Sequence, residues 1–209
     1  MKPSPASPAV GRLARAERSA AVDLVARAMV DNPLHVAAYG DDPDVRLVAH
    51  RRLVGGAIGV MDALDVLALR SRGRVVGVAG MVPAGRCRPT ARQRLRLLPV
   101  LARLGPRAGR RVAGWLGEWS RHDLREPHVH VGPVAVHPDL QGRGLGTRLM
   151  AAVCAELDSS GLPGYLETDK AANVPFYEGC GFEVVGSASV IGVENWFMRR
   201  PSAAPVQTA

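Results

Sequence analysis

The pattern of apolar and polar positions predicts helices interleaved with strands. Four stretches are predicted as helices: 17–30, 42–58, 144–158 and 172–180. Runs rich in apolar and β-branched residues predict strands at 10–13, 65–69, 74–82, 128–136, 164–168, 182–191 and 196–199. This order predicts a single α/β domain, in which a mixed central sheet is flanked by helices and a strand–helix–strand unit lies at 128–168.

Proline and glycine set the expected boundaries of these elements. Asn32-Pro33 should end the first helix, and Gly181 should end the last one. Residues 71–73 should turn a hairpin between two strands. Residues 89–123 read as mostly helical, with breaks expected at Pro99 and at Gly105-Pro106.

The composition fits one globular domain. The chain has 209 residues, of which 47% are hydrophobic and 22% are charged. Pro-, Ser- and Ala-rich segments predict disordered tails at 1–9 and 201–209, which leaves 10–200 as the folded domain. No apolar run is long enough to span a membrane, and residues 1–10 lack the apolar core of a secretory signal. We therefore expect a cytoplasmic protein without membrane contact.

Cysteine usage points away from cross-links. Cys87, Cys154 and Cys180 are odd in number and widely spaced, which fits neither a disulfide framework nor zinc-ligand spacing. We expect reduced thiols that pack as small apolar side chains, and no metal.

The basic charge is concentrated in one segment. The formal net charge is +8, and residues 86–111 hold nine arginines and no acidic residue. An apolar stripe of Leu95, Leu98, Leu101 and Leu104, with Val100 between, predicts an amphipathic helix whose arginines are solvated. Such a surface can steer an anionic ligand. Nucleic acid is disfavoured as a partner because the aromatic content of 4% is too low for base stacking, although contacts to phosphates alone stay open.

A glycine-rich turn carries the most specific chemistry. An apolar strand runs through Val134, Ala135 and Val136 into a turn, and Gly142, Gly144 and Gly146 then open a helix. Free backbone N–H groups at a helix N-terminus form an anion site suited to a pyrophosphate, and Arg143 can add a charged contact. The spacing matches neither the Rossmann fingerprint nor a Walker A loop.

Two motifs resemble a known family. The string Q-G-R-G-L-G at 141–146, after a strand, resembles the acyl-CoA loop of the GNAT acyltransferase superfamily, whose signature is Q/R-x-x-G-x-G/A. Asn173, Tyr177, Gly181 and Phe182 lie on or near the positions of a second family block. The resemblance is specific across 126–200 and loose before that. Asp31-Asn32-Pro33, Y-L-E-T at 165–168, N-x-P-F-Y-E at 173–178 and W-F-M at 196–198 look most like the puromycin N-acetyltransferase type.

The resemblance implies an N-acetyltransferase that moves an acetyl group from acetyl-CoA to a primary amine of a small molecule by direct attack in a ternary complex. It implies that the backbone of Val134, Ala135 and Val136 pairs with the pantetheine arm. The other residues that the resemblance assigns to the cofactor are Gln141, Gly142, Arg143, Gly144, Leu145, Gly146, Thr147, Asn173, Pro175 and Tyr177.

Three side chains are candidates for the chemistry. Tyr177 lies where the family often has a tyrosine that donates a proton to the departing sulfur. His130 lies eleven residues before Gln141, where some members have a carboxylate, and alternation places it on one strand face with His128, Gly132, Val134 and Val136. Glu167 on the following strand is the second candidate for the base, and Glu118, His122 and Glu126 are weaker ones.

The acceptor side is less defined by the sequence. Asp31, His35 and Tyr39 follow the first helix, where such enzymes close over their substrate, and they are the expected substrate-binding residues. Acetylation of a protein N-terminus or lysine, and a non-catalytic module that binds acyl-CoA or nucleic acid, are the alternatives. The identity of the acceptor, the choice of base and the formation of a homodimer stay open.

Overall fold

A single twisted sheet organises the chain. The computed structural model describes residues 8–60 and 64–203. Its strands are β1 (Ala9–Arg12), β2 (Asp65–Ser71), β3 (Arg74–Val82), β4 (Val129–Val136), β5 (Gly164–Thr168), β6 (Glu183–Val190) and β7 (Val193–Arg200). Within the described residues they form one sheet in the order β1-β2-β3-β4-β5-β7-β6, and β4–β5 is its parallel pair. The predicted mixed sheet is therefore confirmed.

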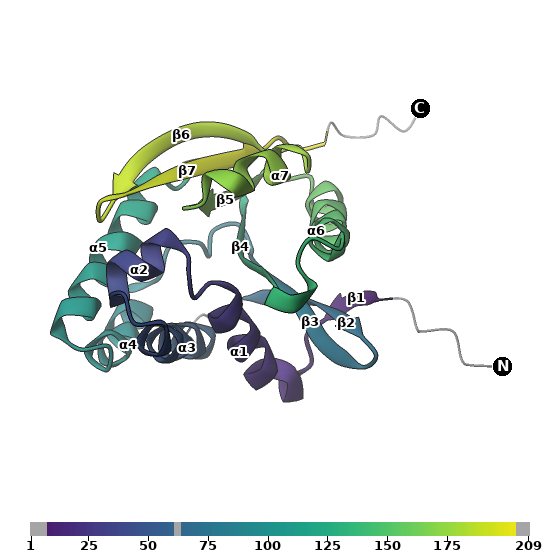
Figure 1. Cartoon of the computed structure of the whole chain (residues 1–209). Coiled ribbons are helices and arrows are strands. Elements are labelled where there is room, and N and C mark those ends of the chain that lie inside the picture. Colours follow the sequence, from purple (N-terminus) through teal and green to yellow (C-terminus); the bar gives the residue numbers. More distant parts are fainter. Residues whose placement is uncertain (1–7, 61–63, 204–209) are drawn as a thin grey trace, which may run out of the picture.

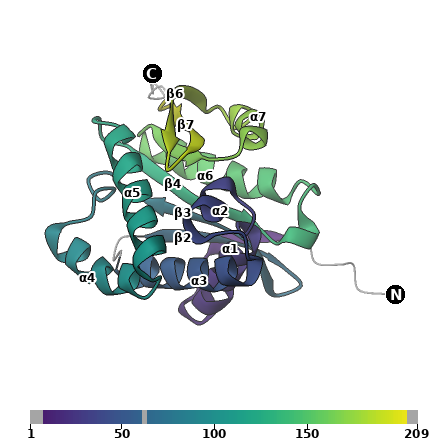
Figure 2. The same ribbon diagram turned by 60° about the vertical axis from the view of Figure 1, so that its left-hand side comes forward.

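Helices cover both faces of the sheet (Figure 1). They are α1 (Arg18–Ala28), α2 (Pro33–Tyr39), α3 (Pro43–Val60), α4 (Ala91–Ala102), α5 (Pro106–His122), α6 (Leu145–Ser160) and α7 (Val174–Glu178). Figure 1 shows α6 on one side of the sheet and α1 to α5 on the other. In Figure 2, α1, α2 and α3 stand in front of strands β2 and β3.

The buried apolar side chains form three clusters. One cluster joins α6 to the sheet and includes Leu149, Val153 and Val131. Another joins α1 to β2, β3 and β4. The remaining cluster lies under α2, α3 and α5 against β5 and β7, with Trp115 and Phe197 at its centre. Helices α1 and α6 pack directly on the sheet, whereas α4 packs on α3 and α5.

Several boundaries differ from the predictions. Pro33 was predicted as the end of the first helix, but it also begins a second helix, α2. Its fixed φ and missing N–H suit the first helical position. Pro99 lies inside α4 without ending it, whereas Gly105-Pro106 does separate α4 from α5. The last helix ends at Glu178 and not at Gly181, although Gly181 does adopt a positive φ of 84° in the following turn.

The apolar stripe of the arginine-rich segment is only partly buried. Val100 is buried and Leu101 and Leu104 pack against the core, but Leu95 and Leu98 are 67% and 57% exposed. The predicted stripe is therefore wrong at its first two positions.

The predicted limits of the domain are mostly outside what the structure describes. Ala9, assigned to the first tail, is already part of β1. The predicted tails at 1–7 and 204–209 lie outside the described residues. None of the described helices has both the length and the apolar composition to cross a membrane.

Candidate active site

The two parallel strands at the centre of the sheet diverge. β4 and β5 pair at Val129 with Gly164 and at His130 with Tyr165, at the start of both strands. Beyond these pairs β4 runs on to Val136 while it stays paired with β3 on its other edge. One edge of β4 over residues 131–136 is therefore not paired with β5, and a strand edge of this kind can accept an extended ligand.

A bulge in β4 coincides with this divergence. Along β3, Ala79 to Met81 is a step of two residues, but their partners on β4, Val134 and Val131, are three residues apart. The extra residue falls at Gly132-Pro133, which matches the rule that glycine and proline inside a strand mark bulges.

The bulge changes which side chains share a face. Val131 and Val134 both pack against the cluster under α6, whereas a regular strand would place them on opposite faces. The prediction that Val134 and Val136 share the face of His128 and His130 is therefore wrong. His128 and His130 themselves do lie on one face, since both rings pack against Tyr165 at centroid distances of 5.5 and 5.4 Å.

The glycine-rich turn follows β4 directly. Gly142 and Gly144 have positive φ values of 72° and 74°, a region that favours glycine. Gly144 is the N-cap residue of α6 and no side chain caps this helix end within the described chain. Gln141 donates from Nε2 to the carbonyl of Val136 at 3.1 Å, which ties the turn to the end of β4. Gln141, Gly142, Arg143 and Gly144 are exposed, so the turn can reach a ligand.

The second block surrounds α7. Asn173 precedes α7 and donates from Nδ2 to Thr168 Oγ1 at 3.4 Å, and Pro175 is exposed on the first turn. Tyr177 is 7% exposed and packs on Phe176 and Phe182. Burial raises the pKa of the Tyr177 hydroxyl, so the phenol stays protonated at neutral pH.

The two predicted bases are in contact with each other. His130 Nε2 lies 2.9 Å from Glu167 Oε2, and the Glu167 side chain is only 3% exposed. Burial opposes a charge on the imidazole, but the Glu167 carboxylate outweighs it and raises the pKa of His130. The fold thus brings together two residues that the sequence offered as alternatives.

A further group of polar side chains adjoins this pair. His128 Nε2 lies 2.9 Å from Asp123 Oδ1, and the nearer ring nitrogen of His130, Nδ1, lies 4.0 Å from the same oxygen. Burial lowers the pKa of His128, but the contact with Asp123, helped by Cys87 and the Glu126 carbonyl, raises it to about 10. Burial raises the pKa of Asp123, and the opposing effect of His128 leaves that pKa below its usual value.

Sequence reasoning did not single out Asp123 or Cys87. Cys87 lies 41 residues before His128 in the chain, yet their ligand atoms and that of His130 lie within 4.8 Å of one another. The feature that could have revealed this proximity is the antiparallel pairing of β3 with β4. It pairs Val82 with His130 and brings the loop after β3 to the start of β4.

The weaker acid–base candidates are held at the surface. Glu118 pairs with Arg121 and lies 3.5 Å from His122, whose ring stacks on Phe197 with centroids 4.2 Å apart. Glu126 forms an ion pair with Arg199 at 2.7 Å. These partners occupy Glu118 and Glu126 in surface contacts.

The predicted acceptor residues separate into two places. Asp31 is exposed and forms an ion pair with the buried Arg46 at 2.6 Å. His35 is 3% exposed, and its Nε2 lies 3.2 Å from Nε2 of His50. Tyr39 is also buried, with ring centroids 6.0 Å from His35. The structure therefore groups His35 with Tyr39 and leaves Asp31 outside that group.

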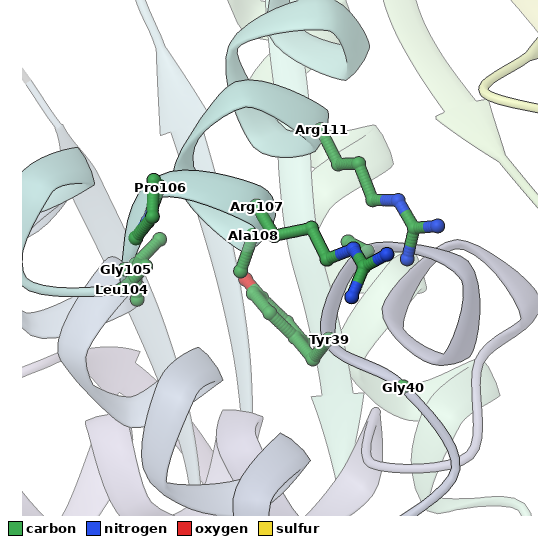
Figure 3. A pocket seen from close by; sticks show the side chains of 9 residues that line it. Tyr39, Gly40, Leu104, Gly105, Pro106, Arg107, Ala108 and Arg111 are labelled. Carbon is green, nitrogen blue, oxygen red and sulfur yellow. The ribbon is translucent and has the colours of Figure 1, made fainter.

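A hollow adjoins Tyr39 at the first turn of α5. It has a volume of about 450 Å³ and is lined by nine residues that include Gly40, Arg107 and Arg111. Figure 3 shows the guanidinium groups of Arg107 and Arg111 extending to the same side of the Tyr39 ring. The residues of the β4–β5 divergence do not line this hollow.

Comparison with known proteins agrees with this arrangement. Two central parallel strands that diverge, with a glycine-rich turn and a helix after the first of them, are typical of an acyltransferase class of α/β fold. Residues 60–182 match the acetyltransferase (GNAT) family, and the chain belongs to this family. The family that this model describes is one of acetyltransferases.

Solved structures share the fold, and a curated relative shares part of the sequence. A structure from Corynebacterium glutamicum described as histone acetyltransferase HPA2 and related acetyltransferase has a TM-score of 0.73 and 22% identity, covering 96% of this chain and 99% of that chain. The Salmonella typhimurium protein yncA, solved with its cofactor acetyl-CoA, has a TM-score of 0.56 and 19% identity, covering 97% and 99%. The mycothiol acetyltransferase of Brachybacterium faecium is 40% identical over 65 residues. That match covers 30% of this chain and 19% of the relative, so it spans about a fifth of the relative's length.

Proposed function

We propose that the protein transfers the acetyl group of acetyl-CoA to a primary amine of a small molecule, by direct attack of the amine within a ternary complex. The observation that carries the proposal is the divergence of β4 from β5 beside the glycine-rich turn. It offers an unpaired strand edge, a helix N-terminus and a group of acid–base side chains along one line.

The cofactor would lie along this line. In the proposal the backbone of Val134, Ala135 and Val136 pairs with the amides of the pantetheine arm. The N–H groups of 142–147 and the side chain of Arg143 bind the pyrophosphate. Positive φ at Gly142 and Gly144 supports this role, because a backbone that turns its N–H groups outward suits a phosphate. Asn173 and Pro175 would contact the arm from α7.

The chemical step needs three things from the protein. The amine nitrogen attacks the thioester carbonyl, the carbon–sulfur bond breaks, and coenzyme A leaves as a thiolate that must be protonated. Tyr177 would donate this proton, and its burial supports the role because it keeps the phenol protonated. The His130–Glu167 pair would accept the proton that the amine loses, and the 2.9 Å contact supports their action as a unit.

The acceptor pocket is proposed on the side of α2. Asp169, directly after β5, accepts hydrogen bonds from the backbone N–H of Leu34 at 2.8 Å and from Asn32 Nδ2 at 3.2 Å. This anchors α2, with His35 and Tyr39, beside the end of β5. The motifs that resemble the puromycin N-acetyltransferase type support a small, amine-bearing acceptor over a protein.

A thiol-release assay tests the proposal. Acetyl-CoA is presented with a panel of aminonucleosides, aminoglycosides, polyamines, amino-sugar thiols and peptides, and free coenzyme A is measured. We expect turnover with at least one small amine and none with the peptides. Calorimetry should show that acetyl-CoA binds. The absence of both binding heat and coenzyme A release would refute the proposal, and turnover confined to peptides would move it to protein acetylation.

Matched variants test the residues. Tyr177→Phe and Glu167→Gln should each lower kcat about 100-fold or more while acetyl-CoA binding is retained, as expected for loss of a general acid or base. Tyr165→Phe and Glu156→Gln are the controls, since among the described residues the Tyr165 hydroxyl donates to the His122 carbonyl and Glu156 pairs with Arg12. Equal kcat in Tyr177→Phe and Tyr165→Phe would remove Tyr177 from the mechanism.

A further inference from the structure

We propose that Cys87, Asp123, His128 and His130 bind a divalent transition-metal ion, with Zn²⁺ as the matching ion. The four residues come from three segments: the loop after β3, the connection from α5 to β4, and the start of β4. The ligand atoms of Cys87, His128 and His130 lie within 4.8 Å of one another.

The separations are close to those around one shared ion. Zinc bonds of about 2.0 to 2.3 Å in tetrahedral geometry place neighbouring ligand atoms roughly 3.3 to 3.8 Å apart. Asp123 Oδ1 lies 2.9 Å from His128 Nε2 and 4.0 Å from His130 Nδ1, so binding would move this oxygen about 0.4 Å away from the first atom and about 0.2 Å toward the second. The ligand atoms of Cys87 and the two histidines lie within 4.8 Å of one another, and Cys87, which lies in a loop, would have to move closer to the ion.

The polar atoms that would face the ion lack other partners. His128 Nε2 and Asp123 Oδ1 are buried, and neither has a hydrogen-bond partner of acceptable geometry among the described residues, despite their close approach. Buried polar atoms without partners are costly, so they call for an explanation. A metal ion bound by both atoms would satisfy both, in place of their direct 2.9 Å contact.

The outer ring nitrogens of both histidines are held as metal-bound imidazoles require. His128 Nδ1 lies 2.8 Å from the carbonyl of Glu126, which leaves Nε2 for the ion. His130 Nε2 lies 2.9 Å from Glu167, which leaves Nδ1 for the ion. Imidazole ligands typically donate their other N–H to a carbonyl or a carboxylate, and this pattern occurs at both rings.

The chemistry of the set selects the ion. A thiolate and two imidazoles favour Zn²⁺ and similar ions over Mg²⁺ and Ca²⁺, which prefer oxygen. One thiolate and one carboxylate neutralise the two charges of the ion. Arg88 contacts Asp123 Oδ2 at 3.6 Å, on the oxygen that faces away from the imidazoles, so it leaves Oδ1 available.

The proposed ion would fix the positions of the segments that meet where β4 diverges from β5. It would tie the loop after β3 to β4 just before the strand diverges from β5, and it would fix the His130 ring with Nε2 toward Glu167. The inference rests on the ligand set and shares His130 with the proposed function. With Nδ1 on the ion, Glu167 would be the member of the His130–Glu167 pair that accepts the amine proton.

The experiment uses the full chain without a polyhistidine tag. Metal content is measured by elemental analysis, and the protein freed of metal by chelator dialysis is then titrated with Co²⁺. We expect about one ion per chain, with a tetrahedral cobalt spectrum and a thiolate-to-cobalt charge-transfer band. Absence of this spectrum in the wild-type protein, with Co²⁺ in excess, would overturn the proposal.

Variants locate the site. Cys87→Ser should abolish the charge-transfer band, and His128→Gln and Asp123→Asn should weaken Co²⁺ binding at least about tenfold. Cys154→Ser and His137→Gln, outside the cluster, should bind as the wild type does. A band that persists in Cys87→Ser would refute the assignment.

Alkylation gives a readout that needs no variant to fold. Bound Zn²⁺ should protect Cys87 from iodoacetamide, as seen by mass spectrometry of peptides, and leave Cys154 and Cys180 unchanged. Equal labelling of Cys87 with and without Zn²⁺ would contradict a thiolate ligand.

Discussion

Acid should destabilise the protein through a pair of buried histidines. His35 on α2 and His50 on α3 are 3% and 5% exposed, with their Nε2 atoms 3.2 Å apart. Burial lowers the pKa of His50 to about 3. Burial, together with the positive charges of His50, Lys170 and Arg46, lowers the pKa of His35 well below its usual value. Both rings are therefore neutral in the folded protein.

The sign and size of the effect follow from proton linkage. In the unfolded chain both histidines take up a proton as the pH falls through 6.5, while the folded chain does not. The stability that the neutral rings carry is complete above pH 6.5 and is lost as the pH falls toward the folded pKa values. Each histidine contributes a loss of about 1.4 kcal/mol per pH unit, so the pair should cost roughly 2.7 kcal/mol at about pH 5.5 relative to neutral pH.

Urea unfolding across this range measures the effect. The free energy of unfolding is followed from about pH 7.5 to 5 in the wild type and in His50→Gln, which keeps a hydrogen-bonding group beside His35. The difference between their slopes should be about 1.4 kcal/mol per pH unit, since all other titrating groups are shared. Parallel curves for the wild type and His50→Gln would refute the reasoning.

Two further substitutions probe the β4 bulge and the anchoring of α2. Gly80→Ala places a Cβ 2.4 Å from the carbonyl oxygen of Gly132 in the β4 bulge, and we expect a loss of about 1–3 kcal/mol in urea unfolding, whereas Gly117→Ala, with open space around it, should not destabilise. Asp169→Ala removes the acceptor of the Leu34 N–H and should cost about 1–3 kcal/mol by the same assay, and a loss below about 0.5 kcal/mol would contradict the anchoring of α2.

Local patterns were sufficient for most of the elements. The hairpin around 71–73, the strand at 164–168 and the helix that follows the glycine-rich turn appear where apolar periodicity and turn residues place them. These elements depend on contacts between neighbours in the sequence and on one buried face. Such information is present in any window of about ten to fifteen residues.

The missed features depend on distant parts of the chain. The start of α2 is capped by Asp169, 135 residues away, so no local signal beyond Pro33 marked it. α3 runs to Val60, two residues past the predicted end, and it needs glycine at position 56 because a Cβ there would lie 2.6 Å from Val100 of α4. Pro99 is tolerated inside α4 because the carbonyl that loses its partner belongs to the exposed Leu95.

The candidate site also contains features that local sequence predicts and features that depend on distant parts of the chain. The glycine-rich turn was predicted because its glycines and the following helix are contiguous in the sequence. The base candidates were found singly, because contact between His130 and Glu167 requires the register of two parallel strands. Cys87 and Asp123 were not found, since only the packing of three segments brings them to His128.

The bulge in β4 connects these observations. Before it, His128 and His130 point toward the face of the sheet that carries α2 and α5, where Asp123 and Glu167 meet them. After it, the shift of one residue turns Val134 into the core under α6 and leaves the strand edge beside the glycine-rich turn. A regular strand would instead direct Val134 toward the side of His130 and place its bulk beside the acid–base group. One inserted residue therefore lets a single strand present polar side chains toward α2 and α5 and leave bare backbone along its edge beside the glycine-rich turn, and Gly80 is the position on β3 that leaves room for it.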